Sequence, residues 1–256
     1  MRFPRKAMVL AAGLGTRLAP LTDRVPKALL EIGGRPMIEY PLRMLAAAGV
    51  EEVIVNLHHL GERIRAALGN GARCGLRVRY SPEDPILDTG GAIAHARPLL
   101  GDEPFAIANC DALLDPDLEA LWRLHEQRGA LATLVVRADP HAKRYGALDL
   151  DSTGVVRRFL GKPALSEVEG PANIDAPLER RMFCGVHVLS PAIFAHLPAV
   201  RVFSVTRDLY GPLVVSGARL CGFDYRGYWR DLGTPDSLSA ARRDLAAQVF
   251  DPAYLR

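Results

Sequence analysis

The sequence predicts an α/β fold with a mostly parallel central sheet. Short apolar runs alternate with amphipathic segments over the first half of the chain, and the β-branched run Val53-Ile54-Val55 is typical of a strand covered on both faces. Alternation of this kind favours parallel strands joined by helices. At 256 residues and 49% hydrophobic composition, the chain is long and apolar enough to form one core. We therefore expect a single domain over residues 1–256.

The elements of the first half follow from the positions of the apolar residues. Ile38, Leu42 and Leu45 fall on one face of a helix, whereas the β-branched and short apolar runs between polar segments indicate strands. The expected order is strand 7–12, helix 38–48, strand 53–56, helix 60–68, strand 76–80, helix 89–99, strand 105–108, helix 116–127 and strand 131–136.

The pattern changes after about residue 138. Short alternating segments at 147–150 and 155–160 predict a β-hairpin, and residues 164–180 are typical of a loop because they contain two prolines, a glycine and four acidic residues. We interpret 138–190 as an elaboration of the same domain that carries a small lid. A strand at 182–189, a helix near 205–216, a strand at 220–225 and a helix from Pro235 complete the chain.

Composition and charge argue against several functional classes. The net charge of +3 is small beside 32 basic and 29 acidic side chains, so we expect no binding to nucleic acid. No apolar stretch approaches the ~20 residues needed to span a bilayer, and the N-terminus lacks the apolar core of a signal peptide. We expect a cytoplasmic protein without membrane contact. The four cysteines form no Cys-x-x-Cys pair, which argues against a zinc or redox motif.

A glycine-rich loop follows the first expected strand, within residues 10–18. Gly13 and Gly15 have no Cβ and allow backbone N–H groups to approach an anion closely, while Arg17 and Lys27 add full positive charges nearby. The first 27 residues contain six basic side chains against the single carboxylate of Asp23. This end of the molecule is therefore expected to bind a polyanion.

Neither of the two common phosphate-binding motifs fits this loop. Gly15 is followed by Thr16-Arg17 instead of the Gly-Lys-Ser/Thr ending of a Walker loop, and Leu18 stands where a dinucleotide fingerprint needs its third glycine. An isolated Gly-x-Gly is also compatible with a tight turn between a strand and a helix.

The longer pattern resembles a known family. Leu10-Ala11-Ala12-Gly13-Leu14-Gly15-Thr16-Arg17-Leu18, followed by Pro20-Leu21-Thr22 and Pro26-Lys27, is similar to the signature of the sugar-1-phosphate nucleotidylyltransferases. Further similar segments occur in the family's order along nearly the whole chain, at 87–92, Asp111, 161–163, 183–186 and 229–235. The resemblance implies a Rossmann-like three-layer sandwich with a small β-hairpin lid, the nucleotide-diphospho-sugar transferase fold.

The resemblance also implies a reaction, in which a nucleoside triphosphate and a sugar 1-phosphate give an NDP-sugar and pyrophosphate with Mg²⁺ as cofactor. Arg17, Lys27 and Asp111 are the catalytic residues that it implies, and Asp111 and Asp231 are the metal ligands. One or two carboxylates suit Mg²⁺, which keeps several waters. On sequence grounds alone, Asp111 is also compatible with a helix N-cap before Pro116 and Asp231 with a turn residue.

The remaining implied site residues divide between the two substrates. The nucleotide-binding residues are Ala11, Ala12, Gly13, Gly15, Thr16, Glu83, Gly90 and Gly91, and the sugar-phosphate-binding residues are Asn109, Gly146, Lys162, Asn173 and Gly185. The chain departs from the family's pattern at Gly161, where a glutamate is usual, and at Cys110, where a glycine is usual. Lys162 also has an alternative interpretation as a solvated charge on a hairpin.

Two subfamilies remain open at this stage. The short length and residues 81–83, 87–91 and 225–227 resemble bacterial N-acetylmuramate-1-phosphate uridylyltransferases, whereas Tyr145-Gly146, Lys162-Pro163 and 229–235 resemble mannose-1-phosphate guanylyltransferases. The alternatives outside this activity are a non-catalytic nucleotide-sugar-binding regulatory subunit and a glycosyltransferase of related fold. The latter normally has two acids separated by one residue, and Asn109-Cys110-Asp111 lacks the first. We expect a monomer or a small homo-oligomer.

Overall fold

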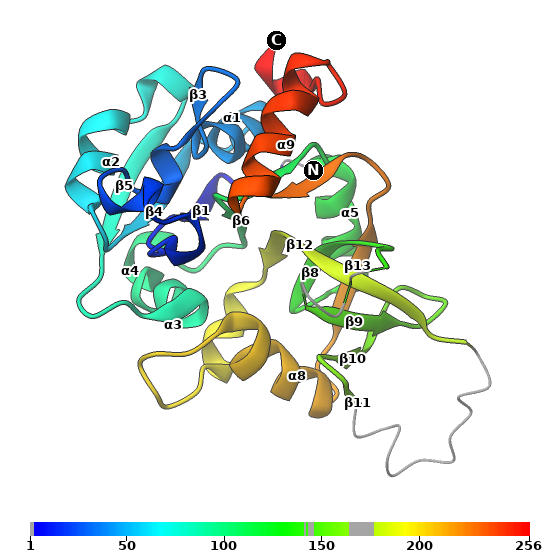
Figure 1. Cartoon of the computed structure of the whole chain (residues 1–256). Coiled ribbons are helices and arrows are strands. Elements are labelled where there is room, and N and C mark those ends of the chain that lie inside the picture. Colours follow the sequence, from blue (N-terminus) through cyan, green and yellow to red (C-terminus); the bar gives the residue numbers. More distant parts are fainter. Residues whose placement is uncertain (1–2, 141, 143–145, 164–176) are drawn as a thin grey trace.

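A computed structural model describes residues 3–140, 142, 146–163 and 177–256. Its centre is a set of parallel strands (Figure 1) in the order β6 (Phe105–Asn109), β1 (Lys6–Leu10), β4 (Glu52–Leu57) and β5 (Arg77–Pro82). Every residue of β4 is buried, as the continuous β-branched run predicts. The α/β prediction with a parallel sheet at its centre is confirmed.

The long strand β12 (Glu179–Leu189) joins this parallel core to an antiparallel region. On one side it pairs with β9 near its start and with β6 near its end, and on the other side it pairs with β8, where the register shifts between Phe183 and His187. The expected hairpin is present, and its first strand extends the large sheet through β12. The antiparallel strands of this region are β8 (Ala132–Arg137), β9 (Ala147–Leu150), β10 (Val156–Phe159) and β11 (Lys162–Pro163). Strand β13 (Leu220–Asp224) pairs with β8 in the parallel direction.

Helices cover both faces of the sheet and give three layers. Residues along β1 alternate between the two sides: Ala7 and Val9 belong to one hydrophobic cluster and Met8 to the other. Helices α1 (Glu39–Ala47), α2 (Gly61–Leu68) and α5 (Leu118–Arg128) contribute to the first cluster. Helices α3 (Asp88–His95), α4 (Arg97–Leu100) and α8 (Gly211–Val215) contribute to the second.

The single helix expected over 89–99 is two helices in the structure. Helix α3 ends at His95 and α4 begins at Arg97, with Pro98 in its first turn. Proline has no N–H to donate to the carbonyl four residues earlier, so a continuous helix would lose a hydrogen bond at this point. The break explains why the apolar pattern alone overestimates the length of this element.

A third cluster lies beside the large sheet and carries the C-terminal helix α9 (Pro235–Ala246), which begins as expected at Pro235. Thr234 caps it in a reciprocal arrangement with Ser237. This helix follows β14 (Trp229–Asp231), which pairs with β7 (Ala112–Leu114) in a small antiparallel sheet; β2 (Glu31–Ile32) and β3 (Arg35–Pro36) form another. Two segments far apart in the sequence therefore meet at β7 and β14.

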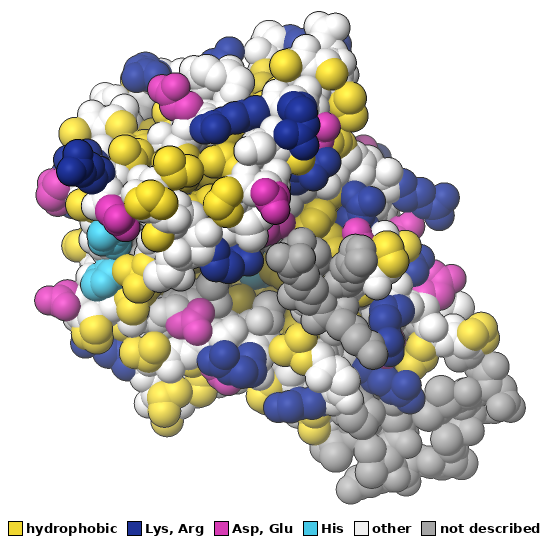
Figure 2. All heavy atoms as spheres, in the orientation of Figure 1, with side chains coloured by type: hydrophobic (Ala, Val, Ile, Leu, Met, Phe, Trp, Pro, Cys, Tyr) yellow, Lys and Arg dark blue, Asp and Glu magenta, His cyan; other side chains and the backbone are white. Residues whose placement is uncertain are grey.

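Basic, acidic and hydrophobic side chains are interspersed over the face in Figure 2, which shows no continuous surface of one charge sign. No helix in the described part of the chain combines the length and the apolar character needed to cross a bilayer.

Candidate active site

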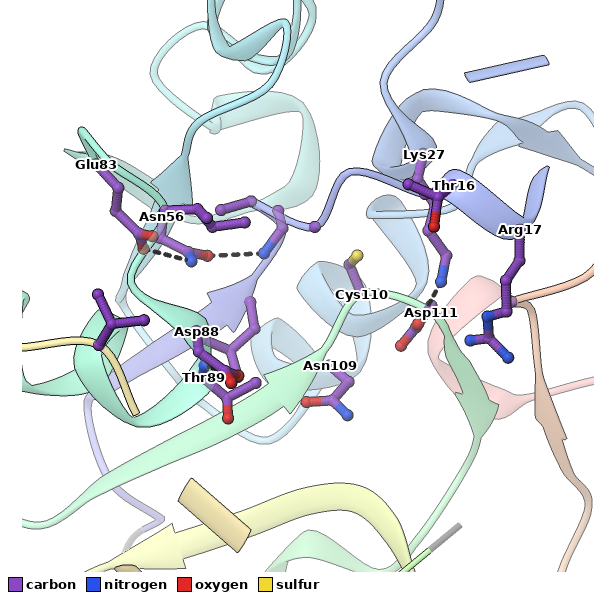
Figure 3. Close-up of a pocket in the computed structure, with 18 residues that line it drawn as sticks. Thr16, Arg17, Lys27, Asn56, Glu83, Asp88, Thr89, Asn109, Cys110 and Asp111 are labelled. Carbon is purple, nitrogen blue, oxygen red and sulfur yellow. Dashed lines mark hydrogen bonds and ion pairs between the residues drawn. The ribbon is translucent and has the colours of Figure 1, made fainter. Parts of the chain in front are cut away.

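A cavity of about 570 Å³ lies beyond the carboxyl ends of the parallel strands (Figure 3). Ligands of open α/β sheets bind at this edge because the loops after successive strands meet there. Three segments that the sequence analysis identified separately, after β1, β5 and β6, converge on the cavity. The predicted residues that line it are Ala11, Ala12, Gly13, Gly15, Thr16, Arg17, Lys27, Glu83, Asn109 and Asp111.

The glycine loop forms one wall, and Gly15 is needed there for two reasons. Its φ of +67° is left-handed, and a Cβ at this position would lie 2.8 Å from Cγ2 of Thr22. The hydroxyl of Thr22 donates to the carbonyl oxygen of Gly15 at 2.9 Å, which holds the turn. A Cβ built at Gly13 would have no atom within 4 Å, so that the backbone of Gly13 is open to an approaching ligand.

Lys27 and Asp111 form an ion pair inside the cavity (Figure 3). Lys27 is only 9% exposed. Burial lowers the pKa of Lys27, but the charge of Asp111, the hydrogen bond to Asp111 and the charge of Asp231 outweigh burial, so that the pKa of Lys27 is raised above the usual value. Lys27 therefore keeps a positive charge in a partly desolvated place.

Asp231 lies beside Asp111 although the two residues come from distant parts of the sequence. The N–H of Leu232 donates to the backbone oxygen of Asp111 at 2.8 Å, and Asp231 is the register partner of Ala112. Burial and then the negative charge of Asp111 raise the pKa of Asp231. The structure thus brings the two predicted metal ligands together.

The alternative interpretations of these aspartates are resolved by the same contacts. Asp117, not Asp111, caps α5, because its side chain accepts from the N–H of Ala120 at 2.8 Å. Asp231 does stabilise the following turn, since its Oδ2 accepts from the N–H of Gly233 at 3.0 Å. This hydrogen bond uses only Oδ2 of Asp231, and the carboxylate group of Asp231 still lies beside Asp111.

Arg17 is exposed at the rim of the cavity. Within the described part of the chain, its guanidinium group takes part in no hydrogen bond or ion pair, although the charge of Arg17 lowers the pKa of Asp231. A guanidinium fork matches phosphate oxygens in two parallel hydrogen bonds. Arg17 is thus available for an anionic ligand.

Asn56 and Glu83 line the opposite wall and are both buried. Asn56 is a residue that the sequence analysis missed; a polar side chain at the end of a fully buried strand is the signal that could have identified it. Other lining residues that it did not assign to the site include Ile86, Asp88, Thr89, Val202 and Gly233. Asp88 and Thr89 lie within the segment 87–92, of which only Gly90 and Gly91 were predicted to bind the nucleotide.

Gly90 and Gly91 do not line the cavity. Both N–H groups donate to the carbonyl oxygen of Phe203, at 2.9 and 3.1 Å. A Cβ at Gly90 would lie 2.3 Å from the Phe203 ring, and one at Gly91 would lie 2.4 Å from the carbonyl oxygen of Arg201. This corrects the expectation that their backbone contacts a base: the two glycines allow the segment 201–203 to pack closely on α3.

The predicted sugar-phosphate residues are only partly brought together. Asn109 lines the cavity, and Gly185 packs against it: φ is +89° at Gly185, and a Cβ there would lie 3.0 Å from Nδ2 of Asn109. Lys162 lies in β11 and does not line the cavity, nor does Gly146, whose carbonyl oxygen accepts from the N–H of Phe183. Asn173 lies outside the described residues.

Comparisons with known proteins show which sequences and structures this chain resembles. The model of the family described as nucleotidyl transferase matches residues 6–248. UTP–glucose-1-phosphate uridylyltransferase of Synechocystis sp. is 31% identical over 95% of this chain and 64% of its own length. Mannose-1-phosphate guanyltransferase of Candida albicans is 32% identical over 90% of this chain and 61% of its own length. The chain therefore spans less than two thirds of these two relatives.

Another relative matches over nearly all of both chains. N-acetylmuramate alpha-1-phosphate uridylyltransferase of Neisseria meningitidis serogroup B is 36% identical over 93% of this chain and 96% of its own length. Among solved structures, HddC from Yersinia pseudotuberculosis aligns with a TM-score of 0.74 and 24% identity, over 94% of this chain and 100% of that one, which shows a shared fold. Since the family model covers almost the whole sequence, the chain belongs to the nucleotidyl transferase family.

Proposed function

We propose that this protein is an Mg²⁺-dependent sugar-1-phosphate nucleotidylyltransferase, which joins a nucleoside triphosphate to a sugar 1-phosphate and releases pyrophosphate. The observation that carries the proposal is the convergence of Arg17, the buried charged Lys27 and Asp111 on one cavity walled by a glycine loop. Asp231 is not one of the lining residues, but it lies close enough to Asp111 for the charge of Asp111 to raise its pKa. The names of the relatives support the same reaction class.

The two substrates are both anionic, so the main task of the site is to reduce their repulsion. In the reaction, an oxygen of the sugar phosphate attacks the α-phosphorus in line, and the bond from the α-phosphorus to the bridging oxygen of pyrophosphate breaks. Backbone N–H groups beside Gly13 and the fork of Arg17 hold the triphosphate. Lys27 contributes a fixed positive charge at the α-phosphate.

The carboxylates of Asp111 and Asp231 fit a magnesium ion. The described residues contain no group of three or more His, Cys, Asp or Glu side chains arranged for a metal, and Mg²⁺ in nucleotide sites commonly uses one or two carboxylates with water and phosphate oxygens. Burial and, after it, the negative charge of Asp111 raise the pKa of Asp231, and a cation beside the two carboxylates would favour their charged form. When bound, the ion supplies neutralisation of phosphate charge and orientation of the phosphate oxygens.

The Neisseria relative, which matches this chain over nearly its full length, favours UTP and N-acetylmuramate 1-phosphate as substrates. GTP with mannose 1-phosphate is the second candidate, since the Candida relative is a guanyltransferase. With the first pair of substrates, we propose that the protein lies in the cytoplasm and supplies precursors of the cell envelope. We propose further that the protein works without nucleic acid or membrane, as a monomer or small homo-oligomer.

Pyrophosphate release from a matrix of nucleoside triphosphates and sugar phosphates, with and without Mg²⁺, tests the proposal. Release that needs both substrates and stops on chelation of the metal is the expected result. A nucleotide-sugar sensor or a glycosyltransferase releases no pyrophosphate under these conditions, so its absence in every combination would exclude the proposed reaction. The substrate pair with the highest kcat/KM identifies the subfamily.

A further inference from the structure

A buried chain of hydrogen bonds connects the ends of three parallel strands beneath the cavity (Figure 3). The N–H of Ala11, just after β1, donates to Oδ1 of Asn56 at 2.7 Å. Nδ2 of Asn56, at the end of β4, donates to Oε1 of Glu83 at 2.7 Å. The N–H of Leu87 donates to Oε2 of Glu83 at 2.9 Å. The glycine loop is thereby connected to the segment that leads into α3.

The donor and acceptor of each hydrogen bond in this series are fixed by the backbone N–H groups of Ala11 and Leu87 at its two ends. A backbone N–H can only donate, so the side-chain atom of Asn56 that faces Ala11 is the oxygen, and its NH₂ group then points at Glu83. Leu87 likewise presents an N–H at the other end. Position 83 therefore has to accept at both oxygens. Glutamine offers one acceptor and one donor, and its NH₂ would meet an N–H on one side.

We propose that Asn56 is a positioning residue that holds Glu83 as an acceptor-only group on the cavity wall and so restricts the site to nucleobases with a ring N–H. Asn56 and Glu83 are 4% and 5% exposed, and both line the cavity. A carboxylate accepts from N1–H of guanine or N3–H of uracil, whereas the unprotonated ring nitrogens of adenine and cytosine present lone pairs to it. This inference rests on the proposed function for its ligand, but the hydrogen-bond chain itself does not.

Substitutions that exchange the donor and the acceptor between positions 56 and 83 test the inference. Asn56→Asp places two acceptors face to face, and Glu83→Gln places two donors face to face, so each single variant leaves buried polar groups unpaired. The double variant Asn56→Asp/Glu83→Gln reverses the central bond. The new carboxylate at position 56 accepts from Ala11 and from the new NH₂ group at position 83, while the amide oxygen at position 83 still accepts from Leu87. The double variant also has the same net charge as the wild type.

Thermal unfolding is the first measurement. Each single variant is expected to melt lower by on the order of 5 °C, and the double variant is expected to recover most of that loss. The deficit of Asn56→Asp should shrink as the pH falls, because a proton shared between the two carboxyl groups restores a hydrogen bond. Asn70→Asp and Glu119→Gln, at exposed positions, are the matched controls. A double variant as unstable as the sum of the single variants would overturn the hydrogen-bond chain.

Kinetics with a panel of UTP, GTP, ATP and CTP is the second measurement. Each single variant is expected to raise the KM for the preferred triphosphate about tenfold with little change in the KM for sugar phosphate. The double variant should regain that affinity but discriminate less against ATP and CTP, since its amide at position 83 brings an N–H to the wall. Unchanged discrimination would overturn the role in base selection. If the wild type releases no pyrophosphate with any pair, the proposed function fails, while the melting data still decide the hydrogen-bond chain.

Discussion

The guanidinium group of Arg17 lies against the backbone of Gly233, so closely that a Cβ at Gly233 would come within 2.4 Å of Nη2 of Arg17 and 2.9 Å of Oδ2 of Asp231. The contact joins the glycine loop near the N-terminus to the turn that follows β14. Because Gly233 has no side chain, the guanidinium group of Arg17 can lie close to Asp231.

Gly233→Ala should move Arg17 away from its position at the cavity. Because the displaced atom is the end of a flexible side chain, the melting temperature should change little, while kcat/KM for the triphosphate should fall about tenfold or more, as for a weakened charge-assisted hydrogen bond. Steady-state kinetics measures the fall. In an Arg17→Ala background the same glycine substitution should have almost no further effect; full additivity of the two losses would contradict the proposed link.

Asp111→Asn should abolish turnover while leaving cooperative unfolding intact. The substitution removes the charge that pairs with Lys27 and one of two proposed Mg²⁺ ligands, but the backbone bond from Leu232 to residue 111 remains. Asp117→Asn is the matched control, since asparagine caps a helix as well as aspartate does. Initial rates and thermal melts measure the two effects. A variant with the wild-type turnover rate would show that Asp111 is not a metal ligand.

Lys27→Ala should lower kcat on the order of a hundredfold or more, as expected for the loss of a preorganised charge. The positive charge of Lys27 is buried and held beside the carboxylates, so water replaces it poorly. Lys6→Ala, at the opposite end of β1, serves as a control for loss of a lysine without loss of the site. A change confined to KM would show that Lys27 holds the substrate without assisting the chemistry.

His125 should make the protein sensitive to acid. Burial lowers its pKa to about 4 from the ordinary 6.5, and its ring nitrogens bond to Thr133 and Ser190. The unfolded chain therefore binds a proton before the folded one does as the pH falls. The contribution of neutral His125 to the free energy of unfolding is complete above about pH 6.5. It is lost as the pH falls toward 4, and the loss amounts to roughly 3 kcal/mol.

Urea unfolding at a series of pH values measures this loss. His125→Gln should flatten the dependence of the unfolding free energy on pH between 6.5 and 4, and substitution of the exposed His196 is the control. His187, whose pKa burial lowers to about 3, leaves a residual slope in the variant. A slope equal to that of the wild type would show that His125 is not the group responsible.

Much of the fold could be predicted because local patterns determine it. The continuous apolar run of β4 and the helical spacing of Ile38, Leu42 and Leu45 predict buried faces that the structure confirms. Asp111 and Asp231 meet because β14, which ends at Asp231, pairs with β7, which begins just after Asp111. The resemblance to the family, and no local pattern, led us to expect that meeting. The break at Pro98 was missed because apolar periodicity continues through it.

The part of the site that could not be predicted depends on contacts between distant segments. Nothing in the spacing of Asn56 and Glu83 shows that one side chain donates to the other. Gly90 and Gly91 were expected to face a ligand, yet they accommodate Phe203, a residue more than a hundred positions later. Such roles depend on which loop packs on which helix, and that information lies outside any local pattern.

The pairing of β14 with β7 has a consequence for synthesis on the ribosome. A nascent chain that has emerged as far as α8 already contains the glycine loop, Lys27, Glu83 and Asp111, but it lacks Asp231 and Gly233. On the proposed function, translation thus completes the nucleotide-holding part before the second carboxylate exists. The second carboxylate can join the site only after β14 has emerged and paired with β7.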